Sequence, residues 1–432
     1  MAGTLTEGHL RSLGEWLQYL ETLHPKAIAL GLDRVREVYL RLGVRPICPV
    51  IIVAGTNGKG STCAMLEAIY RQAHYRTGLY TSPHLERYNE RVRIDGLAAS
   101  DTALCGAFEA VETARQGVNL TYFEFGTLAA IWLFAQADLE VWIMEVGLGG
   151  RLDAVNVLDA DLAVLTAIDL DHQEYLGATR EAVGREKAGI LRPGKQAVCG
   201  DAAPPQSVSE TANAAGVDLW VAGHQFRSET LTDRWNYFGS AWRRYGLPLP
   251  ALRGRYQIDN ATTVLAALER LAPRLPVDTG AVRAGLLGVK WPARFQVLPG
   301  RPTVILDVAH NPQAARALAA TLGPASSDRR TLAVFGMLSD KDIEGVVAAM
   351  KRSLDRWFVA PLPPPRGAPA AALAAALRRA GVPECAVTSC SEVAEAFTQA
   401  LGAAADTDRI VIFGSFLIVA EVMRCRAASG MP

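Results

Sequence analysis

The feature that most limits the possible folds is a series of short, continuously apolar runs separated by longer amphipathic stretches. Seven of these runs, rich in valine and isoleucine, are predicted strands: 49–54, 141–146, 162–168, 303–309, 331–336, 357–362 and 409–414. Stretches between them, such as 63–73, 125–137 and 314–322, have the composition of helices. Strands that are apolar throughout and separated by helices indicate parallel sheets covered on both faces. The predicted fold class is therefore α/β.

The chain is long enough for two domains. Its 432 residues exceed what one hydrophobic core usually serves. The segment PARFQVLPGRP, at 292–302, carries turn signals before a new predicted strand. We therefore predict a phosphate-loop (P-loop) ATPase domain with a mostly parallel sheet over 1–296. A smaller Rossmann-like α/β domain is predicted over 297–432, with the Pro-rich segment 361–369 as a rigid loop inside it.

Composition and charge argue against several classes of protein. The 44 Lys and Arg residues balance 44 Asp and Glu residues, so net charge gives no case for binding nucleic acid or a membrane. Seven cysteines are scattered without a C-x-x-C pair, which fits a reducing cytoplasm and neither disulfides nor a zinc site. The sequence has no signal-peptide pattern and no apolar run of about 20 residues. We expect a cytoplasmic protein with small-molecule partners, and nothing requires more than a monomer.

Residues 53–62, VAGTNGKGST, follow a predicted strand and lead into a helix expected to begin near Ser61. Three glycines let the backbone turn tightly and point N–H groups inward, beside the positive end of a helix dipole. Lys59 would supply a point charge to the β- and γ-phosphates of a nucleotide, with Ser61 or Thr62 near a metal ion. The common pattern G-x-x-x-x-G-K-[ST] is not met, because its first glycine is missing and Gly60 follows the lysine. A glycine-rich turn that only closes a strand–helix unit is the plainer alternative.

Two further side chains stand at the carboxyl ends of predicted strands. Glu145 ends an apolar run and precedes a glycine-rich loop, where a carboxylate can hold Mg²⁺ beside a phosphate loop. His172 follows the run 162–168 in AIDLDHQEYLG. Each has a plainer alternative, namely an ordinary acid at a strand end and a histidine with a structural role.

The spelling GTNGKGS, at 55–61, resembles the phosphate loop of the Mur ligase superfamily, whose members form amide bonds at the expense of ATP. The glycine after the lysine is similar to the folylpolyglutamate synthase/dihydrofolate synthase branch. Other segments resemble that family's motifs in the family's order: TSPHLERYNERVRIDG (81–96), MEVGLGGRLDAVN (144–156), AIDLDHQEYLGATREAVGREKAGIL (167–191), GRYQIDNATTVLAAL (254–268), WPARFQ (291–296) and LDVAHNP (306–312). The resemblance runs from the first predicted helix to near the C-terminus.

This resemblance implies an ATP site between the two domains and two Mg²⁺ ions. The residues that match ATP-binding motifs are Gly55, Thr56, Asn57, Gly58, Lys59, Gly60, Ser61, Asn260, Arg294, Asp307 and His310. The residues that match metal-binding motifs are Ser82, Glu145, His172 and Lys187. The resemblance also implies that Lys187 is carbamylated, and that Lys59, Glu145, His172 and Lys187 are catalytic.

The resemblance further implies a folate-type acceptor, either 7,8-dihydropteroate or a folate, and L-glutamate as the second substrate. The residues that match the acceptor pocket are Leu30, Gly31, Leu32, Thr121, Phe123, Asp153 and Ala154. The Gly-Ser turn in IVIFGSFLIVAEV (410–422) is also similar to the family's ending, which implies that Ser415 helps to shape the amino-acid site. The expected enzyme is an ATP-dependent ligase that works through an acyl phosphate and releases ADP and phosphate.

Three alternatives remain open from the sequence. A monofunctional folylpolyglutamate synthase would only extend existing folates, and the segment LGLDR (30–34) argues against it. A Mur-type peptidoglycan ligase typically carries an extra N-terminal domain for UDP, whereas only about 50 residues precede the loop here. A nucleotide switch, from a different class of protein, would hydrolyse ATP slowly and without dependence on glutamate.

Overall fold

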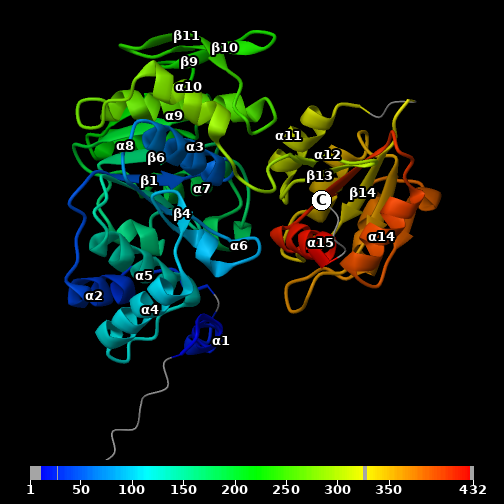
Figure 1. The fold of residues 1–432 in the computed structure, drawn as a ribbon, viewed down its shortest axis with the longest axis horizontal. Helices are drawn as coiled ribbons and strands as arrows, with labels where there is room; N and C mark the ends of the chain where they lie inside the picture. Colours follow the sequence, from blue (N-terminus) through cyan, green and yellow to red (C-terminus); the bar gives the residue numbers. More distant parts are fainter. Residues whose placement is uncertain (1–10, 27, 325–327, 429–432) are drawn as a thin grey trace, which may run out of the picture.

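The computed structural model describes residues 11–26, 28–324 and 328–428. The chain forms two α/β bodies of unequal size that lie side by side (Figure 1). The larger body is built on an eight-stranded sheet and carries a separate three-stranded sheet, and the smaller body is built on a six-stranded sheet. The predicted α/β class is confirmed.

The large sheet is mostly parallel. Its strands are β1 Val50–Ala54, β2 Thr77–Tyr80, β3 Val92–Ile94, β4 Leu97–Ala98, β5 Val141–Glu145, β6 Leu162–Leu165, β7 Gln196–Cys199 and β8 Asp218–Val221. Their order is β4-β3-β2-β5-β1-β6-β7-β8, with β3 and β4 as an antiparallel edge. Val53 pairs with both Glu145 and Val164, so the carboxyl ends of β1, β5 and β6 lie side by side. The loops that follow these three strands therefore converge at one edge of the sheet.

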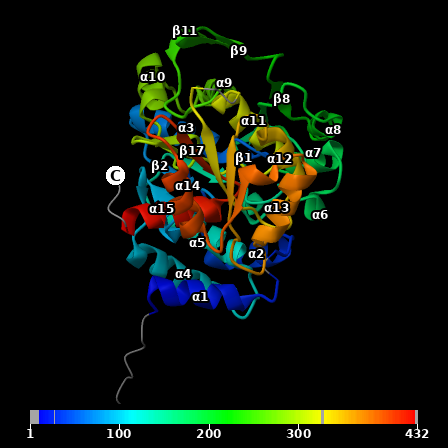
Figure 2. The same ribbon diagram turned by 90° about the vertical axis from the view of Figure 1, so that its right-hand side faces the viewer.

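Two sets of helices cover the two faces of this sheet (Figures 1 and 2). One face carries α1 Leu13–Leu23, α2 Asp33–Leu42, α4 Asp101–Arg115, α5 Tyr122–Gln136, α7 Arg180–Ala188 and α8 Gln206–Ala214. The other carries α3 Lys59–Gln72, α9 Tyr256–Leu271 and α10 Thr279–Gly288. With both faces covered, the central strands are buried throughout, which is why their sequences are continuously apolar.

A small antiparallel sheet packs on the outer side of α9 and α10, at the top of Figure 1. Its strands are β9 Arg227–Thr230, β10 Arg234–Phe238 and β11 Arg243–Pro248. They are not among the predicted strands. The central strand β10 alternates in burial, with Trp235 and Tyr237 buried and their neighbours more exposed. A sheet with one covered face needs only this weaker, alternating pattern.

The smaller body repeats the α/β arrangement on its own sheet. Its strands are β12 Gln296–Leu298, β13 Thr303–Leu306, β14 Thr331–Phe335, β15 Arg356–Val359, β16 Val387–Ser389 and β17 Arg409–Phe413. Their order is β12-β13-β17-β14-β15-β16, and only β12 is antiparallel to its neighbour. One face is covered by α11 Pro312–Leu322, α12 Ile343–Met350 and α13 Ala370–Arg379, and the other by α14 Val393–Ala403 and α15 Phe416–Ala428.

All seven predicted strands are present, as are the three predicted helices. Three strands end three residues before their predicted ends, since β6 ends at Leu165, β13 at Leu306 and β15 at Val359. The residues that follow β6 and β13 enter loops between the two bodies, so their apolar character reflects burial in a junction rather than in a sheet. The Pro-rich segment 361–369 lies between β15 and α13, inside the smaller body. Within the described residues, no helix is both long and apolar enough to cross a membrane.

Candidate active site

A cavity of about 800 Å³ lies between the two bodies. The larger body contributes the loops after β1, β5 and β6, and the smaller body contributes the loops after β13 and β17. All residues predicted to bind ATP or metal ions line this cavity, together with Ser415: Gly55, Thr56, Asn57, Gly58, Lys59, Gly60, Ser61, Ser82, Glu145, His172, Lys187, Asn260, Arg294, Asp307 and His310. Their individual roles stay predictions, because a shared cavity does not assign them.

The phosphate loop connects β1 to α3, which begins at Lys59 rather than near Ser61. Gly58 has a φ of 91°, and a Cβ atom there would lie 2.5 Å from Oδ1 of Asn260, so this position requires glycine. The Lys59 ammonium donates to the carbonyl oxygens of Gly55 at 3.0 Å and Thr56 at 3.2 Å. The loop thus brings a cation to the amino end of α3, where a phosphate is stabilised by the helix dipole and free N–H groups.

Glu145 is the last residue of β5, and only 4% of its surface is exposed. Burial raises the pKa of Glu145, although the nearby charges of Lys59 and Arg294 oppose this effect. The backbone N–H of Ser82 donates to Glu145 Oε2 at 3.3 Å. A carboxylate and a hydroxyl-bearing residue therefore meet beside the phosphate loop, and both offer the oxygen ligands that Mg²⁺ prefers.

Lys187 lies near the end of α7 with 3% of its surface exposed. Its ammonium nitrogen donates to the carbonyl oxygen of Gly55 at 2.7 Å. Burial, together with the positive charge of Lys59, holds the pKa of Lys187 well below its usual range. Burial of this kind favours the neutral amine over the ammonium.

His172 lies in the loop between β6 and the short helix α6 (Gln173–Leu176), with a left-handed φ of 50°. Burial and the positive charge of Lys341 lower the pKa of His172 to about 4, against the opposing effect of Asp171. The imidazole is therefore neutral near pH 7. Its Nε2 lies 2.9 Å from Nζ of Lys341, so this ring nitrogen can accept a hydrogen bond from the ammonium.

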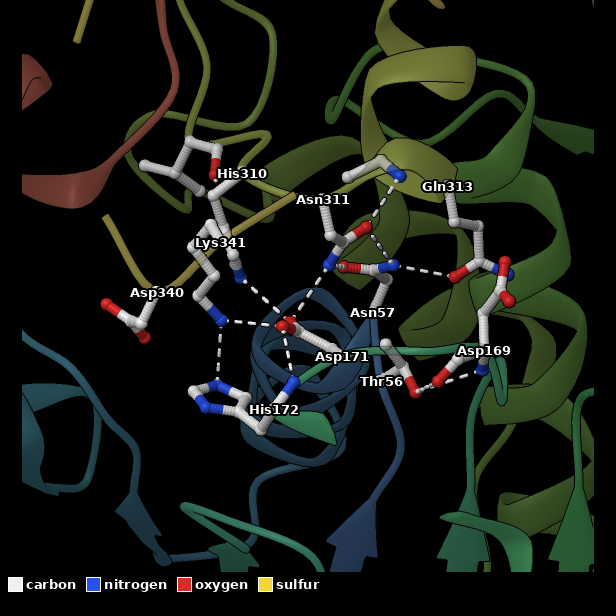
Figure 3. A network of polar contacts seen from close by, with 12 residues as sticks. Thr56, Asn57, Asp169, Asp171, His172, His310, Asn311, Gln313, Asp340 and Lys341 are labelled. Atoms are coloured by element: carbon white, nitrogen blue, oxygen red, sulfur yellow. Dashed lines mark hydrogen bonds and ion pairs between the residues drawn. The ribbon is translucent and has the colours of Figure 1, made fainter. Parts of the chain in front are cut away.

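Asp171 connects the two bodies (Figure 3). Its Oδ1 accepts from Lys341 Nζ at 2.6 Å, and its Oδ2 lies 3.1 Å from Asn311 Nδ2 and 3.3 Å from His310 Nε2. Burial alone would raise the pKa of Asp171, but the hydrogen bond with His310 and the charges of His310 and Lys341 hold it well below its usual range. Asp171 is thus an anion held by three side chains of the opposite body.

A second set of contacts between the bodies starts from the phosphate loop itself (Figure 3). Asn57 Nδ2 lies 3.0 Å from Asn311 Oδ1 and 2.6 Å from Gln313 Oε1. Asn311 also caps α11, because its Oδ1 accepts from the backbone N–H of Ala314 at 3.0 Å. The amino end of α11 is therefore fixed against the loop that would hold the phosphates.

Arg294 and Asp307 reach the cavity from the smaller body. The Arg294 guanidinium lies over the Phe416 ring, 5.2 Å from its centroid. Asp307 accepts hydrogen bonds from the backbone N–H groups of Phe295 and Ala309, each at 2.8 Å. Burial raises the pKa of Asp307, although these hydrogen bonds and Arg294 oppose the effect. The carboxylate thus orders the backbone around Arg294 as well as facing the cavity.

Asn260 lies within a helix, and Ser415 lies in the loop that precedes one. Asn260 is buried inside α9, where its Nδ2 donates to Gln257 Oε1 at 3.0 Å and its side chain packs on Gly58. Ser415 precedes α15, and its Oγ accepts from the backbone N–H of Leu417 at 3.1 Å.

The residues predicted for the acceptor pocket are not among those that line the cavity. They are Leu30, Gly31, Leu32, Thr121, Phe123, Asp153 and Ala154. Thr121 and Asp153 are buried and cap α5 and the 3₁₀ helix η2 (Ala154–Val157), respectively. Phe123 packs on Gly147, since a Cβ atom there would lie 2.6 Å from the ring, and Asp153 Oδ2 accepts from the backbone N–H of Leu148 at 2.9 Å. Gly147 and Leu148 line the cavity, so Phe123 and Asp153 lie directly behind the loop that follows Glu145.

Sequence analysis did not single out Asp171, Asn311, Gln313 or Lys341. Asp171 and Asn311 had a local signal, because each stands next to a predicted histidine in a motif that resembles the family's. Lys341 had none, since a lysine in SDKD has the sequence context of a solvated surface residue. Its side chain is nevertheless only 5% exposed.

Two family profiles match most of the chain. The Mur ligase middle domain matches residues 53–268, and the glutamate ligase domain of Mur ligases matches residues 293–416. The dihydrofolate synthase/folylpolyglutamate synthase of Escherichia coli K12 is 45% identical over 412 residues, which are 95% of this chain and 94% of that protein. The protein of the same name from Mycobacterium tuberculosis is 35% identical over 76% of this chain and 73% of its own length.

Solved structures agree with these matches. E. coli FolC in complex with DHPP and ADP has a TM-score of 0.92 at 45% identity, covering 98% of this chain and 100% of that one. A bifunctional folylpolyglutamate synthase/dihydrofolate synthase with Mn, AMPPNP and L-glutamate bound has a TM-score of 0.89 at 44% identity, covering 98% of each chain. The use of ATP and a divalent metal ion is thereby supported. The chain belongs to the Mur ligase family, in its dihydrofolate synthase/folylpolyglutamate synthase branch, and is an ATP-dependent ligase.

Proposed function

We propose that this ligase joins L-glutamate to 7,8-dihydropteroate, giving dihydrofolate, and also to folates, extending their glutamate chains. The observation that carries the proposal is the meeting of Lys59 and Glu145 with residues of the smaller body in one cavity. Relatives named for both activities support the two acceptors, and the relative that holds AMPPNP and L-glutamate supports the other two substrates.

The reaction has two bond-forming steps. A carboxylate oxygen of the acceptor attacks the γ-phosphorus of ATP, the bond to ADP breaks, and an acyl phosphate forms. The neutral amine of glutamate then attacks the acyl carbon, phosphate leaves, and the nitrogen loses a proton to give the amide. Lys59 and the N–H groups at the start of α3 stabilise the charge on the transferring phosphoryl group, because they are fixed in place before the reaction begins.

The side chains at the cavity fit a magnesium site. Glu145 offers a carboxylate, Ser82 a hydroxyl and His172 a neutral imidazole, and all three line the cavity. We place two Mg²⁺ ions there, held by these residues and by carbamylated Lys187; when bound, the ions neutralise charge on the phosphates. Burial of Lys187 favours its neutral amine and so supports carbamylation, since only the neutral form can add CO₂. Coordination of a metal through His172 Nε2 would require this nitrogen to leave Lys341.

The remaining predicted contacts divide between the nucleotide and the amino acid. Asn260, Arg294, Asp307 and His310 would surround ATP as the two bodies close. The glutamate would bind on the side of the cavity where Ser415 lies with two cations, Lys341 and Arg366, because positive groups suit a dicarboxylate.

We further propose that the two bodies are two domains, 1–296 and 297–432, although residues 1–10 lie outside the described residues. The supporting observation is that β12, the first strand of the six-stranded sheet, begins at Gln296. A monomeric state and a cytoplasmic location remain predictions.

The test is ADP release by the purified protein with Mg²⁺, ATP and L-glutamate, with 7,8-dihydropteroate or tetrahydrofolate as the acceptor. Release with both acceptors supports the proposal. Release with tetrahydrofolate alone would leave only chain extension, and release that does not depend on glutamate would contradict the ligase reaction altogether.

A further inference from the structure

The residues predicted for the acceptor pocket come from three chain segments that are distant in the sequence. They are the segment before α2, the amino end of α5, and the loop before η2. We infer that Arg34 and Glu124 are positioning residues for the acceptor: their ion pair fixes the segment 29–32 against the amino end of α5 and so shapes the acceptor pocket. This inference rests on the proposed function, in which these segments bind dihydropteroate.

Arg34 joins the two sides of this pocket directly. From the second position of α2, its Nη2 donates to Glu124 Oε1 at 2.7 Å and to the carbonyl oxygen of Ala29 at 2.8 Å. Its Nε lies 3.4 Å from Glu124 Oε2. One guanidinium therefore binds both its own segment and α5, which the single-point ammonium of a lysine cannot reproduce.

Glu124 is held firmly enough to serve as the anchor. Its side chain is only 5% exposed, compared with 32% for Arg34. Its Oε2 accepts from the backbone N–H of Thr121 at 2.7 Å, and its own N–H donates to Thr121 Oγ1 at 3.2 Å. This reciprocal cap fixes the carboxylate to the first turn of α5. A buried carboxylate needs such partners, so Arg34 is its charge partner as well as a tether.

The anchored turn leads directly to the cavity. Phe123, next to Glu124, packs on Gly147, which lines the cavity two residues after Glu145. The other end of the segment is tied less strongly, by a single hydrogen bond from Gly31 N–H to the carbonyl oxygen of Leu152 at 3.3 Å. Within the described contacts, the Arg34–Glu124 pair is thus the stronger of the two ties. If the Arg34–Glu124 pair is absent, the acceptor must order the segment 29–32 when it binds. The free energy needed for this ordering weakens binding of the acceptor.

The experiment compares Arg34→Met and Arg34→Lys with the unsubstituted enzyme, using Arg379→Met as the matched control. Arg379 forms an ion pair with Glu344 in the smaller body, with both side chains at least 60% exposed. We expect Arg34→Met to raise the KM for dihydropteroate roughly tenfold, while the KM for ATP and kcat change less than about twofold. Arg34→Lys keeps the positive charge but loses the planar guanidinium with its several N–H donors. Its KM for dihydropteroate should therefore lie between those of Arg34→Met and the unsubstituted enzyme.

Two further measurements separate positioning from general damage. Equilibrium binding of dihydropteroate without ATP should weaken by the same factor as KM in Arg34→Met and remain unchanged in Arg379→Met. The double variant Arg34→Met/Glu124→Gln should lose less binding free energy for dihydropteroate than the two single variants lose together. The reason is that both substitutions remove the same contact.

The outcomes also separate this inference from the proposed function. If the unsubstituted enzyme used no folate-type acceptor, the proposed function itself would fail. If it used dihydropteroate but Arg34→Met changed the KM values for acceptor and ATP equally, or changed neither, only the positioning role would be overturned.

Discussion

The phosphate loop and the Asp171 cluster line the same cavity, yet they hold their charged groups in opposite ways. Lys59 bonds to carbonyl groups three and four residues earlier in the chain. Asp171 bonds to Lys341, 170 residues away, and Lys341 also contacts His172. The Lys59 ammonium is thus held within one short segment. The Asp171 cluster exists only because the two bodies are placed against each other.

This difference assigns different consequences to the two regions. A change at Lys59 removes charge stabilisation from the reaction, but the hydrogen bonds that it breaks lie within the loop. A change in the cluster leaves a buried ion without its partner and weakens the contact between the bodies. The predictions below test whether activity and stability divide in this way.

The largest effect is expected in the loop. Lys59→Met should lower kcat about a thousandfold, because it removes a fixed cation from the transferring phosphoryl group. Steady-state ADP release measures this change, and thermal unfolding should show a shift of only a few degrees. As a control, replacing the half-exposed Lys195 by Ala, Gln or Met should leave kcat unchanged. A loss of less than about tenfold in Lys59→Met would remove the loop from the catalytic step.

The second prediction concerns the lysine that contacts the loop from α7. Lys187→Arg keeps a positive charge but cannot form a carbamate, so kcat should fall roughly a hundredfold. With isotopically labelled bicarbonate, NMR should show a carbamate resonance in the unsubstituted enzyme and in Lys195→Arg, but not in Lys187→Arg. A resonance that persists in Lys187→Arg would place the modification elsewhere.

The third prediction concerns stability. Lys341→Met should lower the free energy of unfolding by about 3 kcal/mol, because it leaves the buried Asp171 carboxylate without its cation. Urea unfolding measures the loss, and adding Asp171→Asn should recover part of it. As a comparison, Arg316→Met breaks the more exposed ion pair of Arg316 with Asp169 between the bodies. It should lower the free energy of unfolding by less than about 1 kcal/mol. Equal losses for both variants would mean that burial of the ion is not the cause.

The fourth prediction follows from the pKa of about 4 for His172. In the unfolded chain its pKa is near 6.5, so between about pH 6.5 and pH 4 the unfolded state binds a proton that the folded state does not. This proton makes the folded protein less stable as the pH falls, by up to about 3 kcal/mol in total. His172→Gln should remove this part of the pH dependence, whereas the exposed His224→Gln should not. Parallel stability curves for His172→Gln and the unsubstituted protein would contradict the assignment.

The smallest effect is expected where the two regions touch. Gln313→Ala removes one of the two acceptors of the Asn57 side chain, and Asn311 remains. The KM for ATP should rise about threefold, as one neutral hydrogen bond predicts, with kcat nearly unchanged. Initial rates over a range of ATP concentrations test this. An effect as large as that of Lys59→Met would show that contact between the bodies, rather than the loop alone, controls the reaction.

The sequence predicted the central α/β architecture and the ATP and metal candidates that line the cavity, for physical reasons that are local. A strand covered on both faces is apolar along most or all of its length, as β1 and β5 are, so its own residues reveal it. The loop at 55–61 can be recognised in the same way, because its glycines and its lysine lie within seven consecutive residues. The half-covered strands β9 to β11 lacked such a pattern and were missed, as were β2, β3, β4, β7, β8, β12 and β16.

By itself, then, the sequence determined the two α/β bodies, the phosphate loop and the position of Glu145 at a strand end. Only the tertiary structure decided that Lys341 is buried against Asp171, that burial lowers the pKa of Lys187, and that Arg34 anchors to Glu124. Each of these depends on how deeply a side chain is removed from water and on which charge lies opposite it. The residues that bury or pair with each of these side chains lie 90 to 170 positions away in the chain. The local sequence around each side chain therefore does not indicate its burial or its partner.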